Sequence, residues 1–363
     1  MIWLTWRQSR LQAASAVVVV AAFAVLLAVT GPHLASLYAS STIGSCRGSA
    51  DTCGGFADDF LQRLYGSSAL GSSSVTGTGT YYLLDLLGIV IILVAPAVIG
   101  MFWGAPLIAS EFEAGTHYLA WNQSITRTRW LAVKLTLIGL AAMAVTEALS
   151  LMQAWWATPI SRAVERGACC SPIAMNQFSP LVFATHGITP LGYAALTFAL
   201  GVTAGVLVRR AVPAMALTLA VFAVMQVAMP LWVRPHLFPP DQTVATLSSF
   251  DSVDVPIDSG TFTVIPDGWA SQPEAWVLSN QAVDMAGKPV SAVPADCMQA
   301  MQSGKASHPA LLDCLTSHGI RIAVTYQPAS RYWAFQWTET AIYVAVALAL
   351  TGYCFWRLVR RRS

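Results

Sequence analysis

The chain has 363 residues, of which 55% are apolar and only 10% are charged, and its mean hydropathy is +0.57. A soluble domain carries about 25% charged residues, so this composition excludes an ordinary soluble protein. Length alone would allow about two domains, but several apolar runs approach the ~20 residues that cross a bilayer, which indicates an integral membrane protein. The net charge of +2 becomes informative only when the charges are divided between the two sides of a membrane.

Six apolar runs qualify as membrane spans, because each ends where charged residues or clusters of Gly, Pro and Ser begin. Unpaired backbone groups are costly in hydrocarbon, so each run is predicted to be a helix. The first run could instead be a cleaved secretory signal, but it is longer than a usual signal core and five more runs follow, which favours a retained helix. The predicted spans are Leu11 to Thr30, Leu83 to Ala109, Leu131 to Ala157, Leu191 to Val208, Ala211 to Val233 and Thr340 to Trp356.

Basic residues are concentrated on one side of these spans. Counted with the N-terminus inside, eleven Lys and Arg residues lie in the short inner segments together with two acids, Glu111 and Glu113. The other nine basic residues lie on the opposite side with thirteen acids. The positive-inside rule therefore predicts a multi-pass protein of the cell membrane with both termini in the cytoplasm.

The predicted fold class is an all-α polytopic membrane protein of six transmembrane helices, with a small α+β extracellular domain between the fifth and sixth. That outer segment of about a hundred residues is long enough for a domain of its own. Within it, residues 260–265 alternate like a strand and residues 309–317 read as a short helix. The expected divisions are a membrane domain over 1–233, with an extracellular loop at 31–82 and a cytoplasmic coupling turn at 110–130, the extracellular domain over 234–335, and the sixth helix with a basic cytoplasmic tail over 336–363.

Six of the seven cysteines fall on the predicted outer side, where thiols are oxidised. Six cysteines allow fifteen pairings, and the partners of the adjacent Cys169 and Cys170 stay open. A metal site is disfavoured because no His lies at a zinc-finger spacing from either close pair. Neighbourhood in the sequence favours two disulfides, Cys46 with Cys53 and Cys297 with Cys314.

The sequence contains no motif for catalysis or for nucleotide binding. Residues 66–73 approach a Walker A pattern but lack its lysine and fall on the predicted outer side. A zinc-binding His-Glu-x-x-His helix, a nucleophile elbow and a Cys-x-x-Cys pair are all absent. We therefore expect no enzyme site, no cofactor bound by this chain and no nucleic-acid partner, while an intramembrane enzyme remains an alternative.

The turn between the second and third spans carries the most informative polar pattern. Two acids, a Gly-Thr break, an apolar and aromatic stretch and a basic return suit a short helix that lies on a cytoplasmic partner. A solvated loop with snorkelling basic side chains is the alternative. The residues of this pattern are Glu111, Phe112, Glu113, Gly115 and Thr116, followed by Gln123, Ser124, Arg127, Arg129, Trp130 and Lys134.

This pattern resembles the same turn in the ABC-2-type exporter permeases, and within them the actinobacterial branch that has a large external domain before the last helix. Further agreement comes from Gly187 to Pro190, from Arg209 and Arg210 before Pro213, and from Tyr326 to Gln336. The resemblance implies a permease that docks through this turn on a separate ATP-binding subunit, which holds ATP and Mg. It also implies a second permease, either another copy or a paralogue. Glu111 and Glu113 would be the charged handle for the ATPase, and Phe112 the apolar anchor.

Polar residues within the spans suggest a translocation path. Glu147 is the only acid well inside a span, and such a group is a functional candidate by default. At 100° per residue, Thr146, Glu147, Ser150 and Gln153 fall within an arc of about 120°. They could line a path for a polar or cationic substrate, or simply bond to neighbouring helices.

The fifth span adds a second candidate surface, since Met225 and Gln226 share one side with Phe222 and Met229. These side chains suit either a soft wall for hydrophobic substrates or contact with membrane lipid. In the fourth span, Gly201 and Gly205 form a Gly-x-x-x-Gly pair that favours close helix packing.

Together these features predict the permease of an ABC exporter that moves a small amphipathic molecule, such as a drug, antibiotic, peptide or lipid, out across the plasma membrane. The alternative is a non-transporting mechanotransmitter or sensor, in which ATP-driven motion inside repositions the external domain. A secondary transporter is disfavoured because the spans contain few charges. The residues do not distinguish among substrates, or between a homodimer and a heterodimer of permeases.

Overall fold

The computed structural model describes residues 2–46, 50–65, 79–113, 127–165, 177–247, 250–254, 265–269, 274–290, 294–297 and 308–360. Several predicted features lie outside the described residues. They are Gly115 and Thr116 of the coupling turn, Cys169 and Cys170, and all but the last residue of the expected strand at 260–265.

Six helices are long and apolar enough to cross a membrane, which confirms the predicted number of spans. Their apolar runs overlap the predicted ones, but the helices extend further, since the first continues to Ser40 and the third to Glu165. The helices are α1 (Ile2–Ser40), α4 (Thr80–Ile99) with α5 (Ala105–Glu113), α7 (Arg127–Glu165), α9 (Thr189–Val208), α10 (Ala211–Ala228) and α13 (Tyr332–Arg360).

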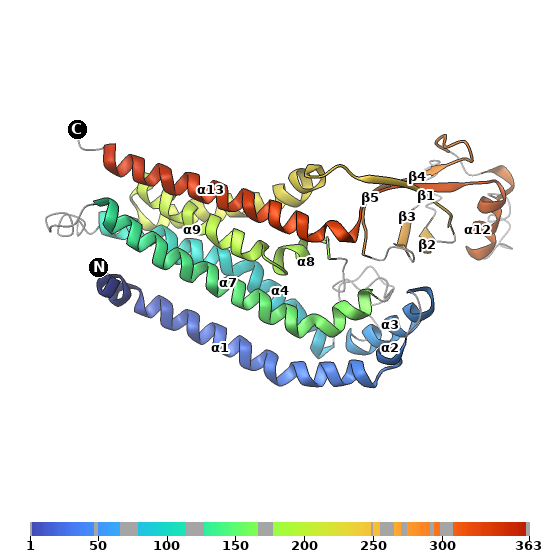
Figure 1. Cartoon of the computed structure of the whole chain (residues 1–363), viewed down its shortest axis with the longest axis horizontal. Coiled ribbons are helices and arrows are strands. Elements are labelled where there is room, and N and C mark those ends of the chain that lie inside the picture. The colour runs from blue at the N-terminus through green and yellow to red at the C-terminus, as the bar shows by residue number, and fades with distance from the viewer. Residues whose placement is uncertain are drawn as a thin grey trace.

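The helices form an elongated bundle in which both chain termini lie at one end and the β-strands lie at the other (Figure 1). We call these the terminal end and the sheet end. Helix α9 is the centre of the bundle, because 72% of its apolar stretch is buried, against 11% for α1. It packs against α13, α5, α7 and α10.

Close packing between α9 and the second span depends on glycine. The second span passes from α4 to α5 through a π-helical turn, η1 (Gly100–Gly104), which begins four residues after Pro96. A Cβ on Gly205 would lie 2.6 Å from the carbonyl oxygen of Ala105, and one on Gly104 would lie 2.7 Å from that of Phe198. Real Cβ atoms do not approach backbone so closely, so these glycines allow the two helices to touch. The predicted packing role of the Gly-x-x-x-Gly pair is confirmed.

The sheet end carries the predicted small α+β unit. Strands β1 (Asp241–Ala245), β5 (Arg321–Gln327) and β4 (Trp276–Val283) form an antiparallel sheet with β5 in the middle. Strands β2 (Phe250–Asp254) and β3 (Ile265–Trp269) form a separate antiparallel pair. Helix α12 (His308–Ser317) confirms the helix predicted at 309–317. Alternate side chains of β5, Ile322 and Val324, are buried with Leu315 of α12, so the unit has a core of its own.

Short helices cover the sheet end of the bundle. They are α2 (Thr42–Ser45), α3 (Ala50–Tyr65) and α8 (Pro180–Thr185). Leu61 and Phe60 of α3 are buried in one apolar cluster with Leu34 of α1 and Trp156 of α7. The segment between the first and second spans is therefore partly helical and packed.

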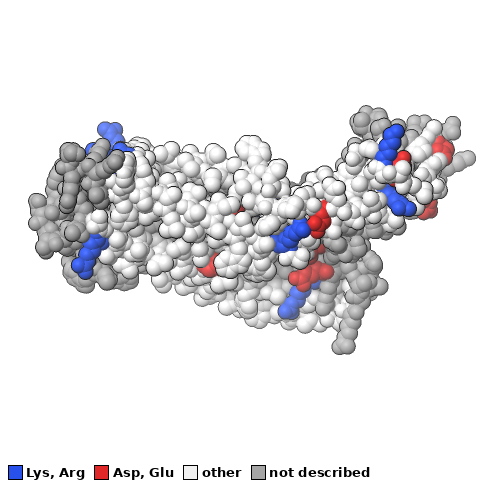
Figure 2. All heavy atoms as spheres, turned by 45° about the horizontal axis from the view of Figure 1, so that its top comes forward, with Lys and Arg blue, Asp and Glu red and all other residues white. Residues whose placement is uncertain are grey.

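Charged side chains are sparse along the bundle. The space-filling view shows Lys and Arg near the terminal end, both signs near the sheet end, and a broad band almost without charge between them (Figure 2). Large apolar side chains are exposed in the spans, among them Val18 of α1 and Val224 of α10, at 66% and 65%. An uncharged apolar band of this kind is the surface expected against lipid.

Candidate functional site

The predicted coupling turn begins where α5 ends. Glu113 is exposed, and its Oε1 accepts a hydrogen bond of 3.1 Å from the backbone N–H of Ala211, the first residue of α10. The first N–H groups of a helix lack intrahelical partners, and a carboxylate there is favourable because the helix dipole is positive at that end. Glu113 therefore joins the end of α5 to the start of α10. Glu111 lies in the same helix, as does Phe112, but their side chains are outside the described part.

The turn between α9 and α10 consists of two arginines. Arg209 ends α9 in a left-handed conformation with φ of 58°, and its N–H donates to the carbonyl of Gly205 at 3.0 Å. Only one further residue separates it from α10. The ends of α5, α9 and α10 are thus tied together at the terminal end.

The polar face predicted on α7 is buried within the bundle. Thr146 is 1% exposed and donates to the carbonyl of Ala142 in its own helix. Ser150 donates to the carbonyl of Thr185 at 2.9 Å, and Gln153 donates through Nε2 to Asp85 of α4 at 2.9 Å. Ser150 and Gln153 therefore cross-link α7 to its neighbours in this conformation.

Glu147 lies on the same face, where Oε1 of Gln153 is enclosed without a hydrogen-bond partner among the described residues. Glu147 is only partly buried, and its Oε2 is likewise an enclosed oxygen without a partner in the described part of the chain. Gln226 of α10 has an enclosed Nε2 atom in the same condition. Its neighbour Met225 packs against a cluster that includes Phe222, Tyr193 and Tyr343. Met225 thus packs among apolar side chains of α9 and α13, whereas Ser150 and Gln153 form hydrogen bonds to the end of α8 and to α4.

A buried ion pair that sequence reasoning missed lies near the sheet end. Arg234 belongs to η3 (Arg234–His236), which follows the π-helical turn η2 (Met229–Val233). Its Nε donates to Oε2 of Glu339 on α13 at 2.9 Å, and its Nη2 donates to Oε1 at 3.2 Å. The two side chains are 1% and 0% exposed.

Further contacts surround this ion pair. The hydroxyls of Tyr193 and Tyr343 donate to Oε1 of Glu339 at 3.2 and 3.0 Å. The guanidinium carbon of Arg234 lies 3.8 Å from the centre of the Phe183 ring, a cation–π arrangement. The fifth and sixth spans are therefore held together through charge as well as apolar packing.

Gln336 of α13 connects two of the stretches that carry the family resemblance. Its Oε1 accepts hydrogen bonds from the backbone N–H groups of Ile188 and Thr189, at 3.1 and 3.0 Å. Its Nε2 donates to the carbonyls of Phe183 and His186, both at 3.2 Å. A single amide therefore fixes the turn between α8 and α9 on the start of α13.

A cavity of about 200 Å³ opens beside these contacts at the sheet end. Three carboxyl groups line it, from Asp85 of α4, Glu165 of α7 and Glu274 before β4, together with His186 and Tyr332. Burial, and secondly the charge of Glu165, raises the pKa of Glu274 to about 7. Burial also lowers the pKa of the His186 imidazole.

Residues 17–234 match the protein family described as ABC-2 membrane transporter related. The chain belongs to this family. It is therefore an ABC permease, a membrane component of a transporter, as the pattern around Glu111 and Glu113 indicated. No curated protein and no solved structure matches the chain. The family match ends as the sheet unit begins, so it covers most of the first five spans of the permease and the turn at 110–130.

The permease carries two disulfides at its sheet end. Cys46 is bonded to Cys53, and Cys297 to Cys314, which are the pairings that sequence neighbourhood favours. Among the described residues, the one free cysteine is Cys354, which is buried in α13.

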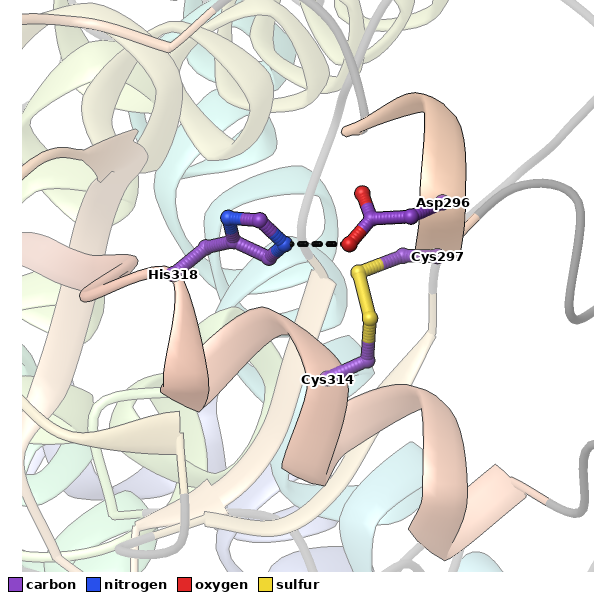
Figure 3. Close-up of side chains that lie close together, drawn as sticks. All are labelled: Asp296, Cys297, Cys314 and His318. Atoms are coloured by element: carbon purple, nitrogen blue, oxygen red, sulfur yellow. Dashed lines mark hydrogen bonds and ion pairs between the residues drawn. A yellow bond between two sulfur atoms is a disulfide. The ribbon is translucent and has the colours of Figure 1, made fainter.

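The second disulfide lies beside two side chains that can bind metals (Figure 3). Ligand atoms of Asp296, Cys297, Cys314 and His318 lie within 4.8 Å of one another. No role was predicted for His318, which follows Cys314 by four residues. Both sulfur atoms are bonded to each other, and Nε2 of His318 pairs with Oδ2 of Asp296 at 2.7 Å. This hydrogen bond lowers the pKa of Asp296. All four groups are therefore paired, the two sulfur atoms in the disulfide and the other two side chains in the hydrogen bond.

Proposed function

We propose that this permease belongs to an ATP-driven exporter and docks at its terminal end on a separate ATP-binding subunit, which holds ATP and Mg. The substrate is a small amphipathic molecule that moves outward across the plasma membrane. In this proposal both termini and the turn at 110–130 face the cytoplasm, and the sheet unit is extracellular. The excess of basic residues at the terminal end supports this orientation.

The observation that carries the proposal is the contact between Glu113 and Ala211. The end of α5 bears the acidic pattern expected to meet the ATPase, and Glu113 links it directly to the fifth span. Through Gly205 and Ala105, the same segment is in backbone contact with α9. A displacement imposed on α5 would therefore reach two further spans without passing through a flexible element.

The working unit contains a second permease, either another copy or a paralogue. Apolar side chains exposed on the single chain, such as Val29 of α1 and Val212 of α10 at 72% and 75%, offer surface for that partner and for lipid. Within the spans, we assign Glu147 and Gln226 to the substrate path, because both belong to the predicted path and each has an enclosed polar atom without a partner among the described residues. Gln153 also has such an atom, but its amide is already bonded to Asp85.

Coexpression with the cognate ATPase tests the coupling role. The double variant Glu111→Lys with Glu113→Lys should still insert and fold, but ATP hydrolysis should no longer drive transport. Glu111→Lys alone leaves the Glu113 contact to α10 intact, so it separates ATPase docking from helix capping. Asp313→Lys, on exposed α12 at the sheet end, is the matched control and should transport normally. Normal transport by the double variant would refute the assignment of this turn.

Export assays then test the path. Glu147→Gln removes the carboxylate charge while keeping its shape, and it should slow export of a cationic amphipathic dye in vesicles. Wild-type export by this variant would show that Glu147 serves helix packing instead.

A further inference from the structure

A groove of about 600 Å³ lies where the fifth span passes into the sheet unit. Its lining includes Pro230 and Leu231 of η2 and Pro235 and His236 of η3. Trp276 and Leu278 at the start of β4 also line it. Pockets that hold small ligands have volumes of about 300–1,000 Å³, so the groove is large enough for a bound molecule.

The lining is mainly apolar, and His236 supplies its one titratable side chain. The segment from Phe238 to Pro240, which also lines the groove, is fixed by contacts with the sheet unit and α13. The ring of Phe238 packs on Phe335 with centroids 4.8 Å apart, and its carbonyl accepts a hydrogen bond of 2.8 Å from Gln327. Arg331 donates to the carbonyl of Pro239 at 2.7 Å. Because these contacts fix the backbone of the lining segment, and because several lining residues are prolines, the groove is preformed.

The groove is continuous with the lipid-facing side of the fifth span. Val224, Val227 and Leu231 follow one another along α10 and η2 and are 65%, 57% and 59% exposed. Leu231 belongs both to this apolar row and to the groove wall. Trp232 is 71% exposed beside it, and Trp is enriched where a membrane meets water. An apolar chain can therefore pass from the bilayer into the groove without crossing charged surface.

We propose that this groove binds one acyl chain of a membrane glycerophospholipid from the adjacent leaflet. An apolar groove at the membrane boundary exposes apolar surface, and burial of such surface is favourable by about 25 cal/mol per Å². An acyl chain matches both the apolar lining and the entry at Leu231. The binding requires neither ATP nor a transport cycle, so it stands or falls independently of the exporter proposal.

Photolabelling of the full chain tests this site. The protein is placed in phosphatidylcholine nanodiscs that contain a trace of phosphatidylcholine with a diazirine near the end of one acyl chain. After irradiation, labelled peptides are mapped by mass spectrometry. We expect label at residues 230–240 and 276–278, in addition to the lipid-facing residues 224–227.

Variants at Leu278 decide whether the label reports the groove. Leu278→Arg places a charge in the lining and Leu278→Trp fills it with an apolar ring. Each should reduce the label at 230–240 and 276–278 at least fivefold while leaving the label at 224–227 unchanged. Val244→Arg is the matched control, because Val244 is 53% exposed on β1 of the same sheet and does not line the groove. Thermal unfolding shows whether each variant folds. If Leu278→Arg does not fold, the label on Leu278→Trp alone tests whether the groove is the binding site.

Three results would overturn the proposal. One is an absence of label at 230–240 and 276–278 in the wild-type protein. Another is undiminished label there in a folded Leu278 variant. The third is a cross-link between two copies of the chain at these residues, since the occupant would then be protein.

Discussion

Arg234 is held on Glu339 by two hydrogen bonds at a point where both side chains are almost completely buried. This pair joins the fifth span, just before the chain enters the sheet unit, to the sixth span, just after the chain leaves it. The sheet unit is therefore inserted between two elements that are fixed to each other. Any relative motion of these spans at the sheet end must separate buried charges.

The ion pair leads to a stability prediction. Removal of one member of a buried pair leaves an uncompensated charge, which costs about 3–5 kcal/mol. Glu339→Ala should therefore lower the thermal unfolding temperature of the purified protein in detergent strongly. The matched control is Asp59→Ala, which breaks the exposed pair with Arg63 on α3, where the side chains are 77% and 56% exposed for Arg63 and Asp59. Exposed pairs contribute about 0–1 kcal/mol. Equal shifts in the two variants would contradict the structural role of the Arg234 pair.

A second prediction concerns the turn that Gln336 binds. Gly187 has a φ of +71°, and a Cβ there would lie 2.8 Å from Oε1 of Gln336. Gly187→Ala should destabilise the protein by about 1–2 kcal/mol from the left-handed backbone alone, and further by disturbing the Gln336 contacts. Gly352→Ala is the control, because this glycine is helical and a Cβ there meets nothing within 4 Å. Thermal unfolding of both variants is the measurement, and unaltered stability of Gly187→Ala would be evidence against the observed turn.

The sequence alone predicts the spans well because a bilayer requires about 20 apolar residues in each one. The helix ends are less predictable. Helix α1 continues beyond Pro32 to Ser40, since Leu34 and Tyr38 of its last turns pack in one apolar cluster with α3. The ion pair gave no local signal either. Arg234 and Glu339 each adjoin an apolar run and lie 105 residues apart, so only the packing of α10 and α13 on α9 brings them together.

The polar face of α7 shows where spacing ceases to be informative. Helical periodicity correctly places Thr146, Ser150 and Gln153 on one face, and all three are buried. Whether such a face lines a substrate path or links helices depends on which residues of the neighbouring helices it meets. The partner of Gln153 is Asp85, which sequence analysis treated only as part of the second apolar run.

A third prediction concerns pH and the cavity at the sheet end. Because burial and Glu165 raise the pKa of Glu274 to about 7, the folded protein holds this proton more tightly than the unfolded chain. The contribution of Glu274 to stability is therefore greatest below its ordinary pKa and is lost as pH rises toward 7. Glu274→Gln lacks this loss, so the variant should match wild type near pH 4.5 and unfold at a higher temperature at pH 8.

Glu165→Gln is the comparison for this pH effect. It removes only the lesser cause of the raised pKa, so its gain at pH 8 should be smaller than that of Glu274→Gln. Unfolding scans of the three proteins across pH 4.5 to 8 provide the measurement. A constant difference between wild type and Glu274→Gln over that range would show that Glu274 is ionised normally.

The last prediction concerns orientation, on which the coupling proposal depends. Asp313→Cys places a thiol on exposed α12 at the sheet end, and Ser110→Cys places one on exposed α5 at the terminal end. Both are made with Cys169→Ser and Cys170→Ser, since the two disulfides and the burial of Cys354 protect the other cysteines. A membrane-impermeant maleimide should label Asp313→Cys on intact cells and Ser110→Cys only after permeabilisation. The reverse pattern would place Glu111 and Glu113 outside the cell, where no ATP-binding subunit could engage them, and the proposed coupling would fail with it.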